Sequence, residues 1–129
     1  MSKRNKIIIS VVILFLLGVI GICKFSFSSG YKIYITNNTN NTVEKLELKY
    51  KVGNIIQTIS QIESKKSWKD TIDTNAIQGG NSIILTYKDN KGNSYEEYIV
   101  GYLEKGYNGK ANVVINNIDE NGKLEITMK

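Results

Sequence analysis

An uncharged hydrophobic run near the N-terminus divides this chain into two parts that belong in different environments. Residues 7–23 read IIISVVILFLLGVIGIC and carry no charge. A helix that continues this run to residue 27 is about 30 Å long, which matches the hydrocarbon thickness of a bilayer. We therefore predict one transmembrane helix over residues 7–27, which would serve as a signal anchor.

The basic residues around this run predict its orientation. Lys3, Arg4 and Lys6 precede the run, and Lys24 alone follows it closely. Because basic flanks stay on the cytoplasmic side, residues 1–6 are expected to be a cytoplasmic tail. Residues 28–30 would be a short linker and residues 31–129 an extracytoplasmic domain. This predicts a single-pass protein of the cell membrane.

Two other interpretations of the hydrophobic run remain open. A cleaved signal peptide would use the small residues around Ser26 and Ser28 and would release the domain. In a lipoprotein, Cys23 would be acylated, although Ile22 stands where such signals carry a small residue. Cys23 is the only cysteine, so the chain cannot form an intrachain disulfide.

Beyond the run, the hydrophobic pattern alternates with the period of a β-strand. The clearest case is KLELKYKV (45–52), in which every second residue is apolar or aromatic. Similar segments lie at 31–36, 54–62, 82–88, 94–103, 111–118 and 123–129, with a weaker one around Trp68. Turn sequences such as DNKGN (89–93) and DENG (119–122) separate them. We predict an all-β domain, an antiparallel Ig-like β-sandwich of seven to eight strands.

One stretch resembles a known family. In LKYKVGN (48–54), Tyr50 and the turn at Gly53 match part of the motif of FxLYD domains, while Lys51 stands where that family has Asp. The wider run 35–64 is similar to the opening of these small Ig-like domains of bacterial surfaces. The resemblance implies a surface-exposed sandwich and supplies no catalytic residues.

The composition argues against most catalytic chemistry. The chain has no His and the predicted domain has no Cys, so imidazole catalysis, thiolate nucleophiles and sites with His or Cys ligands lack their residues. We predict no metal, no cofactor and no enzymatic activity. A remote alternative is an enzyme that uses carboxylates alone, with candidate pairs such as Glu96 and Glu97 or Asp119 and Glu120.

Charge and aromatic content narrow the choice of partners. The four basic residues around the hydrophobic run supply most of the formal charge of +5, which leaves a nearly neutral domain and no reason to expect nucleic acid binding. Four tyrosines fall close together in the sequence and could form a ligand-binding platform: Tyr95, Tyr98, Tyr102 and Tyr107. We predict a membrane-tethered interaction module for an envelope protein. The alternative is a cell-wall or glycan-binding domain that uses these tyrosines.

Overall fold

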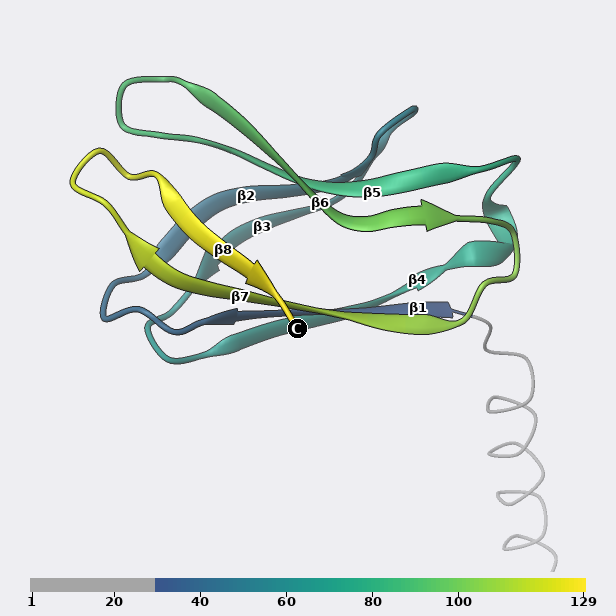
Figure 1. The fold of residues 1–129 in the computed structure, drawn as a ribbon, viewed down its shortest axis with the longest axis horizontal. Coiled ribbons are helices and arrows are strands. Elements are labelled where there is room, and N and C mark those ends of the chain that lie inside the picture. The colour runs from purple at the N-terminus through teal and green to yellow at the C-terminus, as the bar shows by residue number, and fades with distance from the viewer. Residues whose placement is uncertain (1–29) are drawn as a thin grey trace, which may run out of the picture.

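The computed structural model describes residues 30–129, which form eight β-strands and one short 3-10 helix (Figure 1). The strands are β1 (Gly30–Asn37), β2 (Val43–Tyr50), β3 (Ile55–Ile62), β4 (Ser67–Asp73), β5 (Asn81–Lys88), β6 (Ser94–Leu103), β7 (Gly109–Ile118) and β8 (Leu124–Met128), and the helix is η1 (Thr74–Ala76). Within this part of the chain no helix is long and apolar enough to cross a membrane. The predicted anchor at 7–27 and Cys23 lie outside the described residues.

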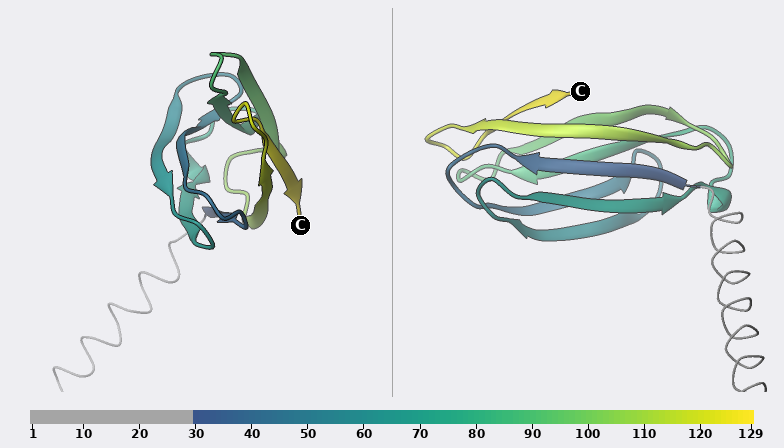
Figure 2. Two further views of the ribbon diagram at one scale, coloured as in Figure 1. Left: turned by 90° about the vertical axis from the view of Figure 1, so that its left-hand side faces the viewer. Right: turned by 90° about the horizontal axis from the view of Figure 1, so that it is seen from below.

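The strands form two four-stranded sheets, in the orders β4-β1-β7-β8 and β3-β2-β5-β6, stacked as two layers (Figure 2). The prediction of an all-β sandwich with seven to eight strands is confirmed. The prediction that all pairing is antiparallel was wrong, because β1 and β7 are parallel. The short connection between β6 and β7 crosses from one sheet to the other and brings β7 beside β1, so both strands start at the same end of the sandwich.

The core lies between the two sheets, on the apolar sides of the alternating strands. Nine of its side chains have no exposed surface or almost none: Ile33, Ile35, Leu46, Leu48, Ile83, Leu85, Leu103, Val113 and Ile115. Each such side chain stabilises the fold by roughly 1.5–3 kcal/mol when it leaves water. Burial of this kind replaces the disulfides that the chain lacks.

The sandwich has two different ends, which we call proximal and distal. The proximal end holds Gly30 and the loops 51–54, 74–80 and 104–108, and the distal end holds the loops 38–42, 63–66, 89–93 and 119–123 (Figure 1). The distal loops contain eight charged residues and the proximal loops three. The chain therefore enters the domain at its less charged end.

Two distal turns share one geometry. The Asp89 Oδ1 atom accepts hydrogen bonds from the backbone N–H groups of Lys91 and Asn93, and Gly92 has φ +83°. Asp119 makes the equivalent bonds in its own turn, where the glycine has φ +86°. Only glycine adopts this conformation without strain, which explains the Asp-x-x-Gly spacing in both hairpins. The prediction of turns at these two positions is confirmed.

A buried asparagine holds the loop that follows β1. The Asn37 side chain is fully buried; its Nδ2 donates to the carbonyl oxygens of Asn41 at 2.7 Å and Ile62 at 2.9 Å. Its Oδ1 accepts from the backbone N–H of Thr39 at 3.0 Å and from the Thr39 hydroxyl at 2.7 Å. Every polar atom of this amide is thus satisfied, as burial requires.

Candidate functional site

A groove opens where strands β2 and β5 separate. They pair only from Glu47 to Tyr50 on β2. If the same register continued, Lys45 would lie directly opposite Lys88, and facing like charges destabilise a strand pair. Lys45 also has a left-handed backbone, with φ +58°, which interrupts the strand locally. The strands part at this point, and the cavity that results has a volume of about 970 Å³.

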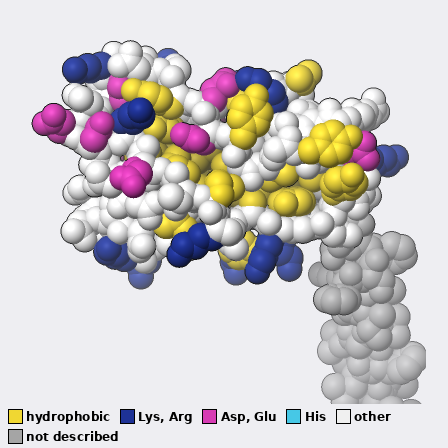
Figure 3. Space-filling model, viewed as in Figure 1, with side chains coloured by type: hydrophobic (Ala, Val, Ile, Leu, Met, Phe, Trp, Pro, Cys, Tyr) yellow, Lys and Arg dark blue, Asp and Glu magenta, His cyan; other side chains and the backbone are white. Residues whose placement is uncertain are grey.

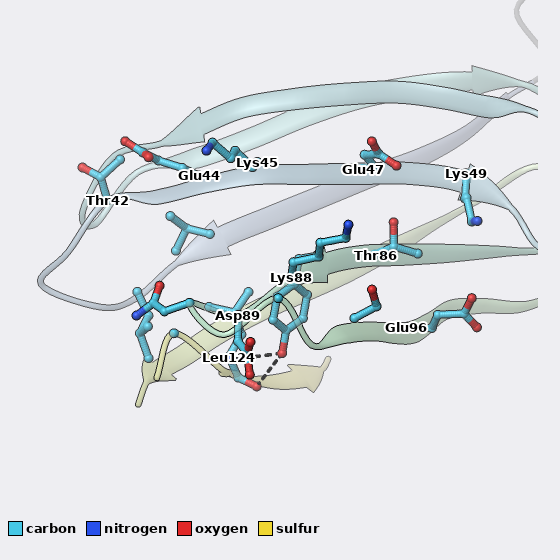
Figure 4. A pocket seen from close by; sticks show the side chains of 17 residues that line it. Thr42, Glu44, Lys45, Glu47, Lys49, Thr86, Lys88, Asp89, Glu96 and Leu124 are labelled. Carbon is cyan, nitrogen blue, oxygen red and sulfur yellow. Dashed lines mark hydrogen bonds between the residues drawn. The ribbon is translucent and has the colours of Figure 1, made fainter. Parts of the chain in front are cut away.

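Charged side chains form the walls of this groove. Figure 4 shows β2 along one wall, carrying Glu44, Lys45, Glu47 and Lys49, and strands β5 and β6 along the other, carrying Lys88 and Glu96. In residues 30–129 the one ion pair joins Lys51 to Glu96 at 2.8 Å, so the lysines of the walls are not engaged in ion pairs there. The hydrogen bond from Lys51 lowers the pKa of the Glu96 carboxyl.

The floor of the groove is apolar and fixed by Tyr87. The other floor residues are Val43, Ile118 and Leu124. The Tyr87 hydroxyl accepts from the Leu124 backbone N–H at 3.0 Å and donates to the Leu124 carbonyl at 3.4 Å, which ties one sheet to the other. Burial raises the pKa of this phenol. The groove thus combines an apolar base, held in place by both sheets, with charged walls.

The four tyrosines singled out in the sequence lie at different positions between the distal and proximal ends of the sandwich. Tyr95 stacks on Tyr87 with the ring centroids 5.1 Å apart, and its hydroxyl donates to Asp89 at the distal end. Tyr98 lies midway along β6, with the Lys51 ammonium 5.6 Å from its ring centroid. Tyr102 and Tyr107 meet edge to face at 6.2 Å at the proximal end. The structure therefore brings two of the four tyrosines together.

Tyr98 also borders a buried residue that the sequence pattern did not single out. Ile84 is on the outer side of its sheet, opposite to its neighbours Ile83 and Leu85, and yet it has no exposed surface. Its partners across the adjacent strands are Lys49 and Tyr98. These long side chains cover Ile84, so Tyr98 has a packing role although half of its surface is exposed.

The carboxylates are dispersed or already engaged. Asp89 and Asp119 accept the backbone hydrogen bonds of their turns, and Glu96 is bound to Lys51. In the described part of the chain no group of three His, Cys, Asp or Glu residues could hold a metal ion. What this arrangement offers chemically is a groove with charged walls and an apolar floor.

The comparisons with known proteins concern the fold. No family model and no curated protein matches the sequence. Among solved structures, the chain is similar to an NMR structure of a protein from Eubacterium rectale, with a TM-score of 0.51 and 20% sequence identity. The match covers 78% of this chain and 89% of that one. At this identity the likeness shows a shared β fold and carries no function with it.

Proposed function

We propose that this chain is a non-catalytic binding module, tethered to the outer face of the membrane by residues 7–27, whose groove receives an envelope protein. The observation that carries the proposal is the position of the groove. The groove opens at the distal end, where Thr42, Asp89 and Gly122 line it, and runs along β2 as far as Lys49, whereas Gly30 starts β1 at the proximal end. A tether at one end leaves the other end open to a partner.

The groove's chemistry specifies the class of partner. Lysines and glutamates alternate along β2, and the floor is apolar. A polypeptide segment with charges of both signs and a few apolar side chains would complement both features. Figure 3 shows acidic and basic side chains together near the distal end, so a partner segment with charges of both signs would find complementary charges there.

Site-specific photo-crosslinking in intact cells tests the groove. A photoreactive amino acid at Glu47 should yield a crosslinked envelope protein, and one at Lys69, exposed on the other sheet, should not. Charge reversal by Lys45→Glu together with Lys88→Glu should abolish the crosslink, while Lys69→Glu leaves it intact. Equal yields from Glu47 and Lys69 would refute the groove as the binding site.

The topology has its own test. Protease added to intact, wall-stripped cells should degrade the chain beyond Gly30 and spare a cytoplasmic control protein. Survival of the domain until the membrane is permeabilised would overturn the extracytoplasmic location.

A second candidate is glycan binding through tyrosines. The observation in its favour is the exposure of Tyr98 and Tyr102, at 53% and 57%, on one strand. Pull-down of residues 30–129 on purified cell wall, compared with a Tyr98→Ala and Tyr102→Ala variant, measures their part. Equal retention of both proteins would exclude it.

We also propose kinship with Ig-like domains of the FxLYD type. Support comes from the place of Tyr50 at the end of β2 and of Gly53 in the following hairpin, with φ +127°. A sequence profile built from relatives of this chain would test the kinship, because a relative with Asp at the position of Lys51 would restore the motif.

A further inference from the structure

The large exposed hydrophobic side chains of this domain lie outside its distal loops. The large ones in residues 30–129 are Val52, Ile55, Tyr98, Tyr102, Tyr107 and Met128, and none belongs to a distal loop. Val52, with 77% of its surface exposed, lies at the tip of the β2–β3 hairpin, and Tyr107 lies in the loop between β6 and β7. Large exposed hydrophobic side chains thus occur in the proximal loops and along the strands, whereas the distal loops carry more of the charged residues. Figure 3 shows the side chains of one face by type.

Two of these residues, Tyr102 and Tyr107, contact each other, and Val52 is linked to them through Asn81 and Gly80; we call the three the proximal surface. The Asn81 side chain binds the backbone N–H of Val52 at 3.2 Å and its carbonyl at 2.8 Å. The neighbouring residue, Gly80, lies beneath the Tyr102 ring, where a Cβ atom would approach within 2.7 Å. Tyr102 then contacts Tyr107. Hydrogen bonds and ring contacts thus hold the patch in place.

The point where the chain enters the domain is bonded to the same patch. The backbone N–H of Gly30 donates to Asn108 Oδ1 at 2.9 Å, next to Tyr107. The Thr74 hydroxyl donates to the carbonyl of Tyr107 at 2.8 Å, which joins the helix η1 to this loop. Whatever precedes Gly30 in the chain must therefore leave the domain beside the proximal surface.

The length of chain before Gly30 sets the distance to the bilayer. Two residues separate position 27, the end of the proposed anchor, from Gly30. Even fully extended, this connection spans only about 10 Å. The headgroup layer of one leaflet is itself about 5–7 Å thick. A domain on so short a connection has its proximal end in contact with headgroups.

We propose that the proximal surface docks on the lipid headgroups of the membrane. Tyrosine suits this interface because its ring is apolar and its hydroxyl is polar, and exposed Val52 adds an apolar side chain on the same side of the domain. Docking fixes the tilt of the sandwich and points the groove away from the bilayer. This inference rests on the proposed anchor, and it adds a lipid-binding surface to the folded domain.

Fluorescence quenching in vesicles tests the docking. The full chain with Cys23→Ser receives one new cysteine, Val52→Cys or, as the distal control, Lys91→Cys, labelled with an environment-sensitive dye. The protein is reconstituted into phosphatidylcholine and phosphatidylglycerol vesicles that contain headgroup nitroxide lipid. The dye at position 52 should be quenched at least about threefold more than the dye at position 91.

Further variants assign the effect to the tyrosines. Tyr102→Ser with Tyr107→Ser should reduce the quenching at position 52 to the level of position 91. Tyr98→Ser, an equally exposed tyrosine in the middle of β6, should leave it unchanged, and near-ultraviolet circular dichroism checks that each variant is folded. Equal quenching at positions 52 and 91 in protein that floats with the vesicles would overturn docking alone. Protein that fails to float would overturn the anchor, and docking with it.

Discussion

Replacement of the buried Asn37 provides the sharpest test of how the distal end is held. Leucine has the same branched shape and number of side-chain heavy atoms as asparagine, so Asn37→Leu removes the hydrogen bonds without leaving a cavity. The Thr39 hydroxyl keeps its bond to the Asn41 carbonyl at 2.9 Å. Two groups lose their side-chain partner: the Thr39 backbone N–H and the carbonyl of Ile62.

The expected loss follows from those two groups. A buried polar group without a partner costs roughly 1–3 kcal/mol, so Asn37→Leu should lower the free energy of unfolding by about 2–6 kcal/mol. A small domain has a total stability of about 5–15 kcal/mol, so this loss is large. With a urea dependence of about 2 kcal/mol per molar, the unfolding midpoint of residues 30–129 should fall by about 1–3 M.

The matched control is an asparagine on the surface. Asn116 donates one exposed hydrogen bond to Thr127 at 2.9 Å, so Asn116→Leu should change stability by less than about 0.5 kcal/mol. Asn37→Asp is a second probe, because it keeps the shape and turns a carboxylate toward two carbonyl oxygens. If urea unfolding places Asn37→Leu within 0.5 kcal/mol of the Asn116 variant, the reasoning about the buried network is refuted.

Four further outcomes follow from the turns and the groove floor. Tyr87→Phe should lose about 1–3 kcal/mol, because the Leu124 N–H is left buried without its acceptor, whereas Tyr34→Phe should be neutral by the same urea titration. Burial raises the pKa of Tyr87 above its ordinary value of 10.0. The contribution of its hydroxyl to the free energy of unfolding is therefore complete below pH 10 and declines as the pH rises through the raised pKa. The difference in stability between wild type and Tyr87→Phe should shrink when urea titrations are run above pH 10. The side-chain hydrogen bond from Asn93 lowers the pKa of Asp89. Ionised Asp89 therefore stabilises the fold above its ordinary pKa of 3.8, and this stabilisation is lost as the pH falls through the lowered pKa. The stability of Asp89→Asn, followed by circular dichroism, should depend less on acid pH than the stability of wild type. Gly92→Ala should cost about 1–2 kcal/mol in thermal or urea unfolding, because alanine is strained at positive φ.

The strands and turns could be predicted because they depend on neighbours in the sequence. Leu46 and Leu48 alternate with charged residues, and both are buried. Asp89 and Asp119 each precede a glycine by three residues, and both start turns. The pattern failed at Val52, which continues the alternation of β2 and yet lies in the hairpin, because the strand ends at Tyr50.

The pairing of strands could not be predicted, and the groove depends on it. Alternation tells which side of a strand is buried, but not which strand lies beside it. The opposition of Lys45 and Lys88 becomes visible only once β2 and β5 are known to be neighbours. The predicted cluster of tyrosines failed for the opposite reason. Tyr95 and Tyr102 are close in sequence, but an extended strand places them about 23 Å apart.

The position of β1 determines how the domain bears load. The first described strand is central in its sheet and pairs over seven residues with β4 on one side and over seven with β7 on the other. A pull between a distal partner and the proposed anchor would run along this strand. It would load both ladders of hydrogen bonds in shear at once and would not break them one bond at a time. The anchor proposed above would thus join the domain at a strand that resists mechanical force well.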